Sequence, residues 1–258
     1  MPRTTLALTS FVSGEFSAKM DGRTDFEKYS SGVKTMENFL VHPQGAATRR
    51  IGTQFISEVK SSAAKTRLIP FEFSTTQTYV LEFGNTYIRF YKDKGQIVSG
   101  GSAYEISTPY LTAELFDIKF AQSADVMYIT HPNHEVMKLS RTGHTAWTLA
   151  AIDFTDGPYL AQNQTATTMA ASGTSGSVTI TASTSTFVAT DVGRLITFNS
   201  GRAKITGYTS ATQVAATTQV NFSGTGAVTD WKLGAFSDTT GHPSCVSFFE
   251  QRLVFAGT

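Results

Sequence analysis

The 258-residue sequence contains a single cysteine, Cys245, and unusually few charges. One cysteine excludes a disulfide within the chain, and a zinc site with four protein ligands would have to be built on histidine. Lys, Arg, Asp and Glu make up 16% of the residues, against a typical share of about 25%. The 21 basic and 20 acidic residues nearly balance, so no overall field draws the chain to nucleic acid or to an anionic membrane.

Long apolar runs are also missing. No run approaches the ~18 residues of a transmembrane helix, and the sequence does not open on a basic segment followed by an apolar one. We therefore expect a soluble chain with no membrane segment and no secretory signal, assembled in the reducing interior of a cell. Phe and Tyr are abundant, and Thr and Ser are frequent, which is typical of β-rich proteins.

The segment from Lys119 to Ala150 predicts four short strands. Its apolar runs are separated by the turn-forming groups Ser-Ala-Asp, His-Pro-Asn-His and Arg-Thr-Gly-His. The segment from Ser244 to Thr258 starts the same pattern again and then stops. Four short antiparallel strands repeated around an axis form a β-propeller, so we predict a mainly β fold with propeller-type blades. The second blade is incomplete, which indicates one part of a larger structural assembly.

Upstream of this segment, the sequence predicts one short helix and several strands. Apolar residues recur at helical spacing between Asp25 and Phe39, although Gly32 in the middle weakens the helix. Residues 1–16 alternate loosely, and Leu6 falls on one face of a strand or extended arm. Further strands are predicted at Gln54 to Val59, Arg67 to Ser74, Thr78 to Phe83 and Tyr87 to Lys92, the last two joined by a Gly84-Asn85 turn.

The composition changes near residue 161. From there to about residue 232 the chain consists largely of Thr, Ser, Ala and Gly, with few charges. Alternating pieces such as SVTITAS and GRLITFNS indicate strands, whereas a disordered Ser/Thr tract would lack this regularity. We predict a small inserted β-domain at 161–232. It follows an N-terminal platform with the first blade or blades at 1–160, and a return to the propeller at 233–258 starts the next blade.

The sequence contains no clear catalytic or cofactor motif. His131, His134 and His144 do not lie one turn apart on a helix, so we interpret them as turn residues and not as metal ligands. The run from Asp153 to Gly157 lacks the later ligands of a calcium loop and is interpreted as a turn. A nucleophile elbow, a phosphate loop and a dinucleotide fingerprint are all missing. We therefore predict no enzyme activity, no metal and no cofactor, although paired carboxylates for glycoside hydrolysis stay open.

A basic bias precedes the first predicted hairpin. It comes from Arg49, Arg50, Lys60, Lys65 and Arg67. Two interpretations stay open. The more common one is a solvated or salt-bridged face. The other is a subunit contact or a DNA-facing surface, in which guanidinium groups meet carboxylates or phosphates.

Several long segments together resemble a known family. These are residues 13–56, 67–91, 120–149 and 231–258, the last ending in FFEQRLVFAGT. They are similar to the N-terminal part of phage tail nozzle proteins, also called tail tubular protein B, of short-tailed bacteriophages. The similarity covers nearly all of the chain outside the Thr/Ser-rich insert.

The resemblance implies a structural virion protein of the phage tail, assembled in the host cytoplasm. Such subunits form a homohexameric ring built on β-propellers at the distal end of the tail. The ring contacts an adaptor (head-to-tail connector) ring, helps hold tail fibres and surrounds the channel through which DNA leaves. Family members are usually longer and continue with more blades, so we expect either a piece of a longer protein or an unusually short member.

A glycan-binding or depolymerase-like receptor protein is the alternative function. Its support is the Thr/Ser-rich insert with the aromatic residues Tyr208 and Trp231. For Trp231 we favour a role in the core, where the insert rejoins the rest of the chain.

Overall fold

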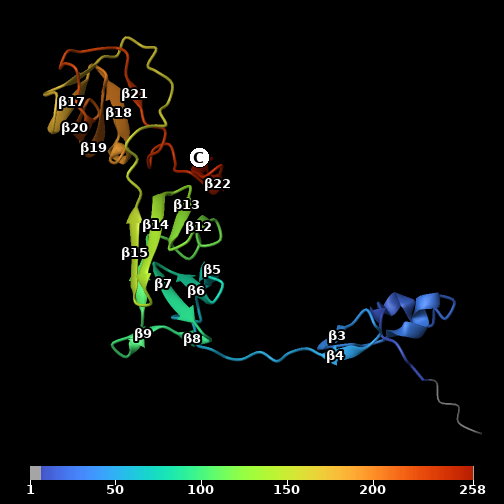
Figure 1. Ribbon diagram of the computed structural model, residues 1–258. Coiled ribbons are helices and arrows are strands. Elements are labelled where there is room, and N and C mark those ends of the chain that lie inside the picture. Colours follow the sequence, from blue (N-terminus) through green and yellow to red (C-terminus); the bar gives the residue numbers. More distant parts are fainter. Residues whose placement is uncertain (1–6, 258) are drawn as a thin grey trace, which may run out of the picture. The chain divides into compact units, whose positions relative to one another are not determined.

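The computed structural model describes residues 7–257, and the chain divides after Phe55 into two units. We call the described residues 7–55 the N-terminal unit and residues 56–257 the main unit. The fold is mainly β, and the described residues contain no α-helix (Figure 1). Leu6 lies outside the described residues, and residues 7–12 form no strand.

The N-terminal unit consists of short elements. The strands are β1 (Gly14–Glu15), β2 (Gly32–Val33), β3 (Phe39–Val41) and β4 (Ala47–Arg49), and the 3₁₀ helices are η1 (Ala18–Met20) and η2 (Glu27–Ser31). Strands β1 and β2 pair in parallel, while β3 and β4 form an antiparallel hairpin. No apolar side chain in residues 7–55 is buried.

The helix predicted from Asp25 to Phe39 is wrong. Only η2 is helical there, and it ends at Gly32, whose φ of −112° and ψ of 168° are extended. A Cβ at Gly32 would lie 2.1 Å from the Phe16 ring, so the glycine admits this ring, which stacks on Tyr29. An amphipathic helix gains most of its stability by packing its apolar face on a core, and this unit buries none.

The main unit begins with an antiparallel sheet in the order β11-β7-β6-β5, with β8 also paired to β7. Its strands are β5 (Arg67–Ser74), β6 (Gln77–Gly84), β7 (Tyr87–Lys92), β8 (Gly95–Gln96) and β11 (Glu105–Ser107), with a small pair, β9 (Val98–Ser99) and β10 (Ser102–Ala103), between them. The three strands predicted between Arg67 and Lys92 are confirmed. The strand predicted from Gln54 to Val59 is wrong, since these residues pair with no strand.

The β6–β7 turn is displaced by one residue from the prediction. Gly84 pairs with Tyr87, so the turn residues are Asn85 and Thr86, and Thr86 has the positive φ of 63°. Gly84 serves a different purpose. A Cβ there would lie 2.2 Å from the Tyr87 ring, so the glycine makes room for the tyrosine of the next strand.

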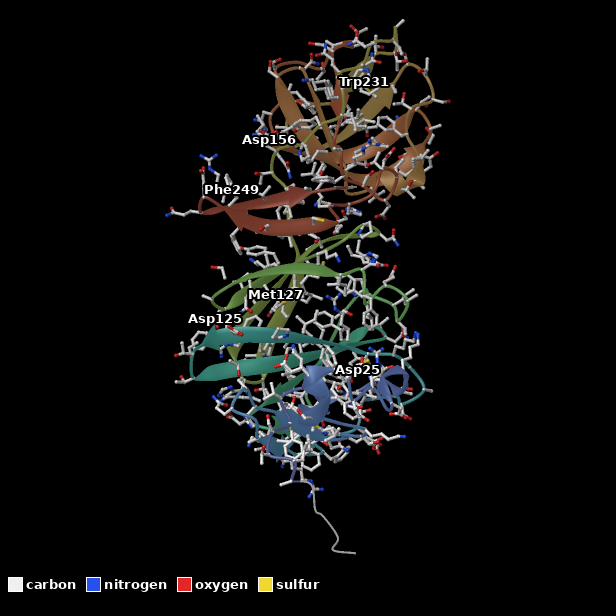
Figure 2. The ribbon with its side chains drawn as sticks, turned by 90° about the vertical axis from the view of Figure 1, so that its right-hand side faces the viewer. Asp25, Asp125, Met127, Asp156, Trp231 and Phe249 are labelled. Carbon is white, nitrogen blue, oxygen red and sulfur yellow. The ribbon has the colours of Figure 1, made fainter. Side chains whose placement is uncertain are left out.

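The segment after Lys119 forms the predicted four-stranded meander. Its strands are β12 (Lys119–Ser123), β13 (Val126–His131), β14 (His134–Gly143) and β15 (Ala146–Ala151), paired in sequence order. The turns fall at the three polar groups that predicted them. Alternation brings Met127, Ile129 and Leu139 to one face, where they are buried. Figure 2 shows Met127 in the layer between this sheet and the first.

Both sheets contribute to one apolar core, with the Trp147 indole near its centre. This ring stacks on Phe90 at 4.5 Å between centroids and meets Phe71 and Tyr79 edge-on at 4.8 and 5.3 Å. Phe71, Tyr79 and Phe90 belong to the first sheet, so Trp147 of β15 joins the two. Edge-to-face and offset aromatic pairs each add about 0.5–1.5 kcal/mol beyond the burial of their area.

The last hairpin, β22 (Cys245–Phe249) with β23 (Arg252–Ala256), pairs with no other strand of the described chain. It packs on the second sheet through side chains, with Phe248 edge-on to Tyr128 at 6.0 Å. Figure 2 shows Phe249 at the end of this hairpin, near its turn. Residues 7–257 form no propeller, because they supply two stacked sheets and a hairpin, fewer than the four or more blades that close one.

The Thr/Ser-rich segment forms its own sheet with its own core. The order is β16-β17-β20-β19-β18-β21, a curled half-barrel. The strands are β16 (Met169–Ala171), β17 (Ser177–Ala182), β18 (Leu195–Phe198), β19 (Gly201–Ser210), β20 (Gln213–Val220) and β21 (Lys232–Leu233), with the 3₁₀ helix η3 (Ala189–Asp191) before β18. Ile180, Ile196 and Val214 are fully buried in the core of this sheet.

The two ends of this insert run side by side. The Asn163 amide donates to the Trp231 carbonyl at 3.0 Å, and the Asn163 side-chain amide donates to the Thr229 carbonyl at 3.0 Å. Arg194 of the insert forms a buried ion pair with Asp191 at 2.7 Å. Nε of Arg194 also donates to the carbonyl of Gly234 at 2.7 Å, which ties the insert to the chain that follows it.

Deletion of residues 165–228 with a short Gly/Ser bridge should leave the two stacked sheets folded. The ends are already within hydrogen-bonding distance, so the bridge costs little closure entropy. Circular dichroism and a thermal melt of the purified variant check this, with the intact chain as the control. Wholesale aggregation of the deletion variant would show that the insert is integral to the main core.

Candidate functional site

The five basic residues predicted at an interface or DNA-facing surface do not form one group within a unit. Arg49 and Arg50 belong to the N-terminal unit, where both are exposed, and Arg50 Nε donates to the Asn38 side-chain oxygen at 2.7 Å. Lys60, Lys65 and Arg67 belong to the main unit.

Lys60 is engaged in a surface ion-pair network. Its ammonium lies 2.6 Å from Glu105, which Arg89 also contacts at 3.0 Å, and it lies 5.0 Å from the centroid of the Tyr87 ring. The hydrogen bond from Lys60, helped by Arg89, holds the pKa of the Glu105 carboxyl below its ordinary value. This arrangement matches the salt-bridged face that the sequence left open.

Arg67 has a role inside the fold. Its Nη1 donates to the carbonyls of Leu115 and Ile118 at 2.8 and 2.7 Å, and the guanidinium lies 6.0 Å from the rings of Phe116 and Phe120. It therefore holds the turn that carries the chain from the first sheet to the second. Lys65 is exposed.

The outer face of the first sheet carries a groove of about 590 Å³. Apolar side chains line most of it: Ile56, Val59, Leu68 and Val80. Two carboxylates, Glu82 and Asp93, also line it. Glu82 is buried, and it accepts hydrogen bonds from the hydroxyls of Tyr87 at 2.6 Å and of Tyr91. Burial of Tyr91 is the main cause, and its hydrogen bond to Glu82 the second cause, of a pKa raised to about 12 for this hydroxyl. The groove suits contact with another apolar surface.

The carboxylates of the predicted turn at Asp153 to Gly157 are paired with bases of the insert. Asp153 lies 2.8 Å from Lys204. Asp156 contacts Arg202 and accepts from the Tyr159 hydroxyl at 3.0 Å, and the Arg202 contact lowers the pKa of Asp156. These pairs join the chain before the insert to strand β19, in agreement with a structural role.

Trp231 packs against the insert core, and its indole N–H donates to the Thr167 carbonyl at 2.9 Å (Figure 2). This is the core role that we favoured over a glycan contact. The alternative glycan-binding function keeps only Tyr208 of its two aromatic residues as an exposed side chain.

A polar cluster that the sequence did not predict lies at the β13–β14 turn. The ring nitrogen Nε2 of His134 is 2.8 Å from Glu114 Oε2, and His131 stands 5.1 Å from His134 between ring centroids. One ligand atom from each of these three residues lies within 4.8 Å of the others. The histidines were weighed as ligands, but Glu114 lies in another turn, and only the stacking of the two sheets brings it close.

No protein-family model matches this chain, and no curated protein matches it. Within residues 7–257, no helix is long and apolar enough to cross a membrane.

We predict that Arg67→Met destabilises the main unit by about 2–3 kcal/mol. The substitution keeps the apolar stem but removes two hydrogen bonds from a charged donor to carbonyls. The matched control is Lys65→Ala, an exposed change expected to stay within about 0.5 kcal/mol. Urea unfolding measures the free energy of unfolding of both variants, and an unchanged dependence on urea concentration shows that the values can be compared. Equal stability of the two variants would contradict the structural role of Arg67.

Proposed function

We propose that this chain is a structural subunit of the tail nozzle of a short-tailed bacteriophage. In this function it acts by assembly into a homohexameric ring with propeller-type blades around the DNA exit channel. The ring would contact the adaptor ring and the tail fibres of the virion. The resemblance of the four long segments named above supports the family, and the ring of six follows from that resemblance.

The observation that carries the proposal is the exposed apolar surface of the N-terminal unit. Eight large apolar side chains of residues 7–55 are exposed: Leu8, Val12, Phe26, Phe39, Leu40, Val41, Ile51 and Phe55. Leu40 is 55% exposed, Phe55 76% and Ile51 87%. Exposed large apolar side chains in this number favour a protein contact, particularly in a unit whose described residues bury no apolar side chain.

The two sheets and the C-terminal hairpin support the blade part of the proposal. They stack face to face in chain order, as consecutive blades of a propeller do. The outer groove of the first sheet provides a further apolar surface of this stack.

The charge balance suits a wall past which DNA moves. Binding of DNA strengthens with each phosphate that a basic residue neutralises. A subunit with 21 basic and 20 acidic residues, several of them paired with each other, would offer passing DNA little attraction.

Leu40→Lys and Ile51→Lys are each expected to reduce self-association of the purified chain without lowering its melting temperature. Both side chains are exposed in one copy, so the charge costs little there, but it would be buried at a contact between copies. The control is Thr53→Lys, which adds the same charge at an exposed polar position of the same unit. Analytical ultracentrifugation over a concentration series compares the variants. Identical association of all three variants and the parent chain would remove the N-terminal surface from the account.

The proposed place in the virion is tested in phage particles. Particles produced without the gene should lack the distal part of the tail in electron micrographs, and supply of the protein in trans should restore it. Complete tails in particles without this protein would overturn the proposal.

A further inference from the structure

The cluster at the β13–β14 turn joins the two sheets of the main unit. Glu114 lies in the connection from the first sheet to the second, while His131 ends β13 and His134 begins β14. Nε2 of His134 is hydrogen-bonded to the Glu114 carboxylate at 2.8 Å. The Leu111 amide donates to the same carboxylate oxygen at 2.9 Å and holds the side chain in place.

Two buried polar atoms next to this pair have no hydrogen-bond partner among the described residues. They are Nε2 of His131, a residue that is 1% exposed, and the hydroxyl of Tyr110, which is 0% exposed. The Tyr110 ring meets His134 edge-on at 5.3 Å and lies 6.1 Å from His131. Buried polar atoms are nearly always satisfied, so two orphans beside three ligand-type side chains indicate a bound species.

The backbone amide of Asn133 donates to Nδ1 of His131 at 3.1 Å, so Nε2 carries the ring proton in this arrangement. Metal binding through Nε2 requires this proton to leave Nε2 and the Asn133 contact to open.

We propose that Glu114, His131 and His134 bind a divalent transition metal of the zinc class. Two imidazoles and one carboxylate are a known zinc donor set that leaves a coordination position open, whereas Mg²⁺ and Ca²⁺ prefer all-oxygen sites. For His134 to bind through Nε2, the hydrogen bond to Glu114 opens and the ring proton sits on Nδ1, so the imidazole stays neutral. The metal fastens the β13–β14 turn to the connection between the sheets. This inference does not depend on the proposed phage function.

The experiment is a zinc titration of the purified chain after dialysis against a chelator. Isothermal calorimetry with Zn²⁺ should show one site, and the metal should raise the melting temperature. Co²⁺ should give the visible absorption of a low-coordinate site. Glu114→Gln and His134→Ala should each lose about 100-fold or more in zinc affinity, since even groups that only orient a metal ligand contribute 10–100-fold.

His42→Ala is the control, because His42 belongs to the N-terminal unit and pairs only with Thr48 through its ring. It should keep the full zinc affinity. Glu114→Gln preserves the shape of the side chain, so its loss of binding with an unchanged metal-free melting temperature would support the site even if His134→Ala fails to fold. Absence of stoichiometric zinc binding by the parent chain would overturn the proposal, and so would equal affinity of Glu114→Gln and the parent.

Discussion

The main unit depends on the contact between the inner faces of two antiparallel sheets, with the Trp147 indole near its centre. The connection between the sheets is held by Arg67, and the cluster of Glu114 with two histidines lies beside it. The insert leaves the second sheet after β15, and the C-terminal hairpin packs on that sheet through Phe248. The C-terminal hairpin therefore rests on the framework of the two sheets, whereas the insert has a core of its own.

The N-terminal unit has no comparable core. Its short strands and 3₁₀ helices are joined by backbone bonds and exposed side-chain pairs, and exposed ion pairs add little stability. Eight of its large apolar side chains are exposed. A segment with this distribution gains stability when another surface covers it. For this reason we propose that assembly involves the surface of this unit.

Local patterns predicted much of the main unit from sequence. The strands from Arg67 to Lys92 and the four-stranded meander follow from alternation and turn residues, which act over a few positions. The helix at Asp25 to Phe39 failed because its periodicity had no core to pack on, and the Gly84-Asn85 turn failed because Gly84 accommodates the Tyr87 ring. Glu114 was missed because it meets His134 across twenty positions, through the stacking of two sheets.

The central claim is that the apolar surface of the N-terminal unit is covered by another protein molecule on assembly. Hydrogen–deuterium exchange measures this directly, by comparing the dilute chain with its assembled ring or with the virion tail. The account predicts fast exchange of the β3–β4 amides (39–49) in the dilute chain and strong protection in the assembly, with little change in β5–β7. Equal exchange of residues 39–49 in both states would contradict it.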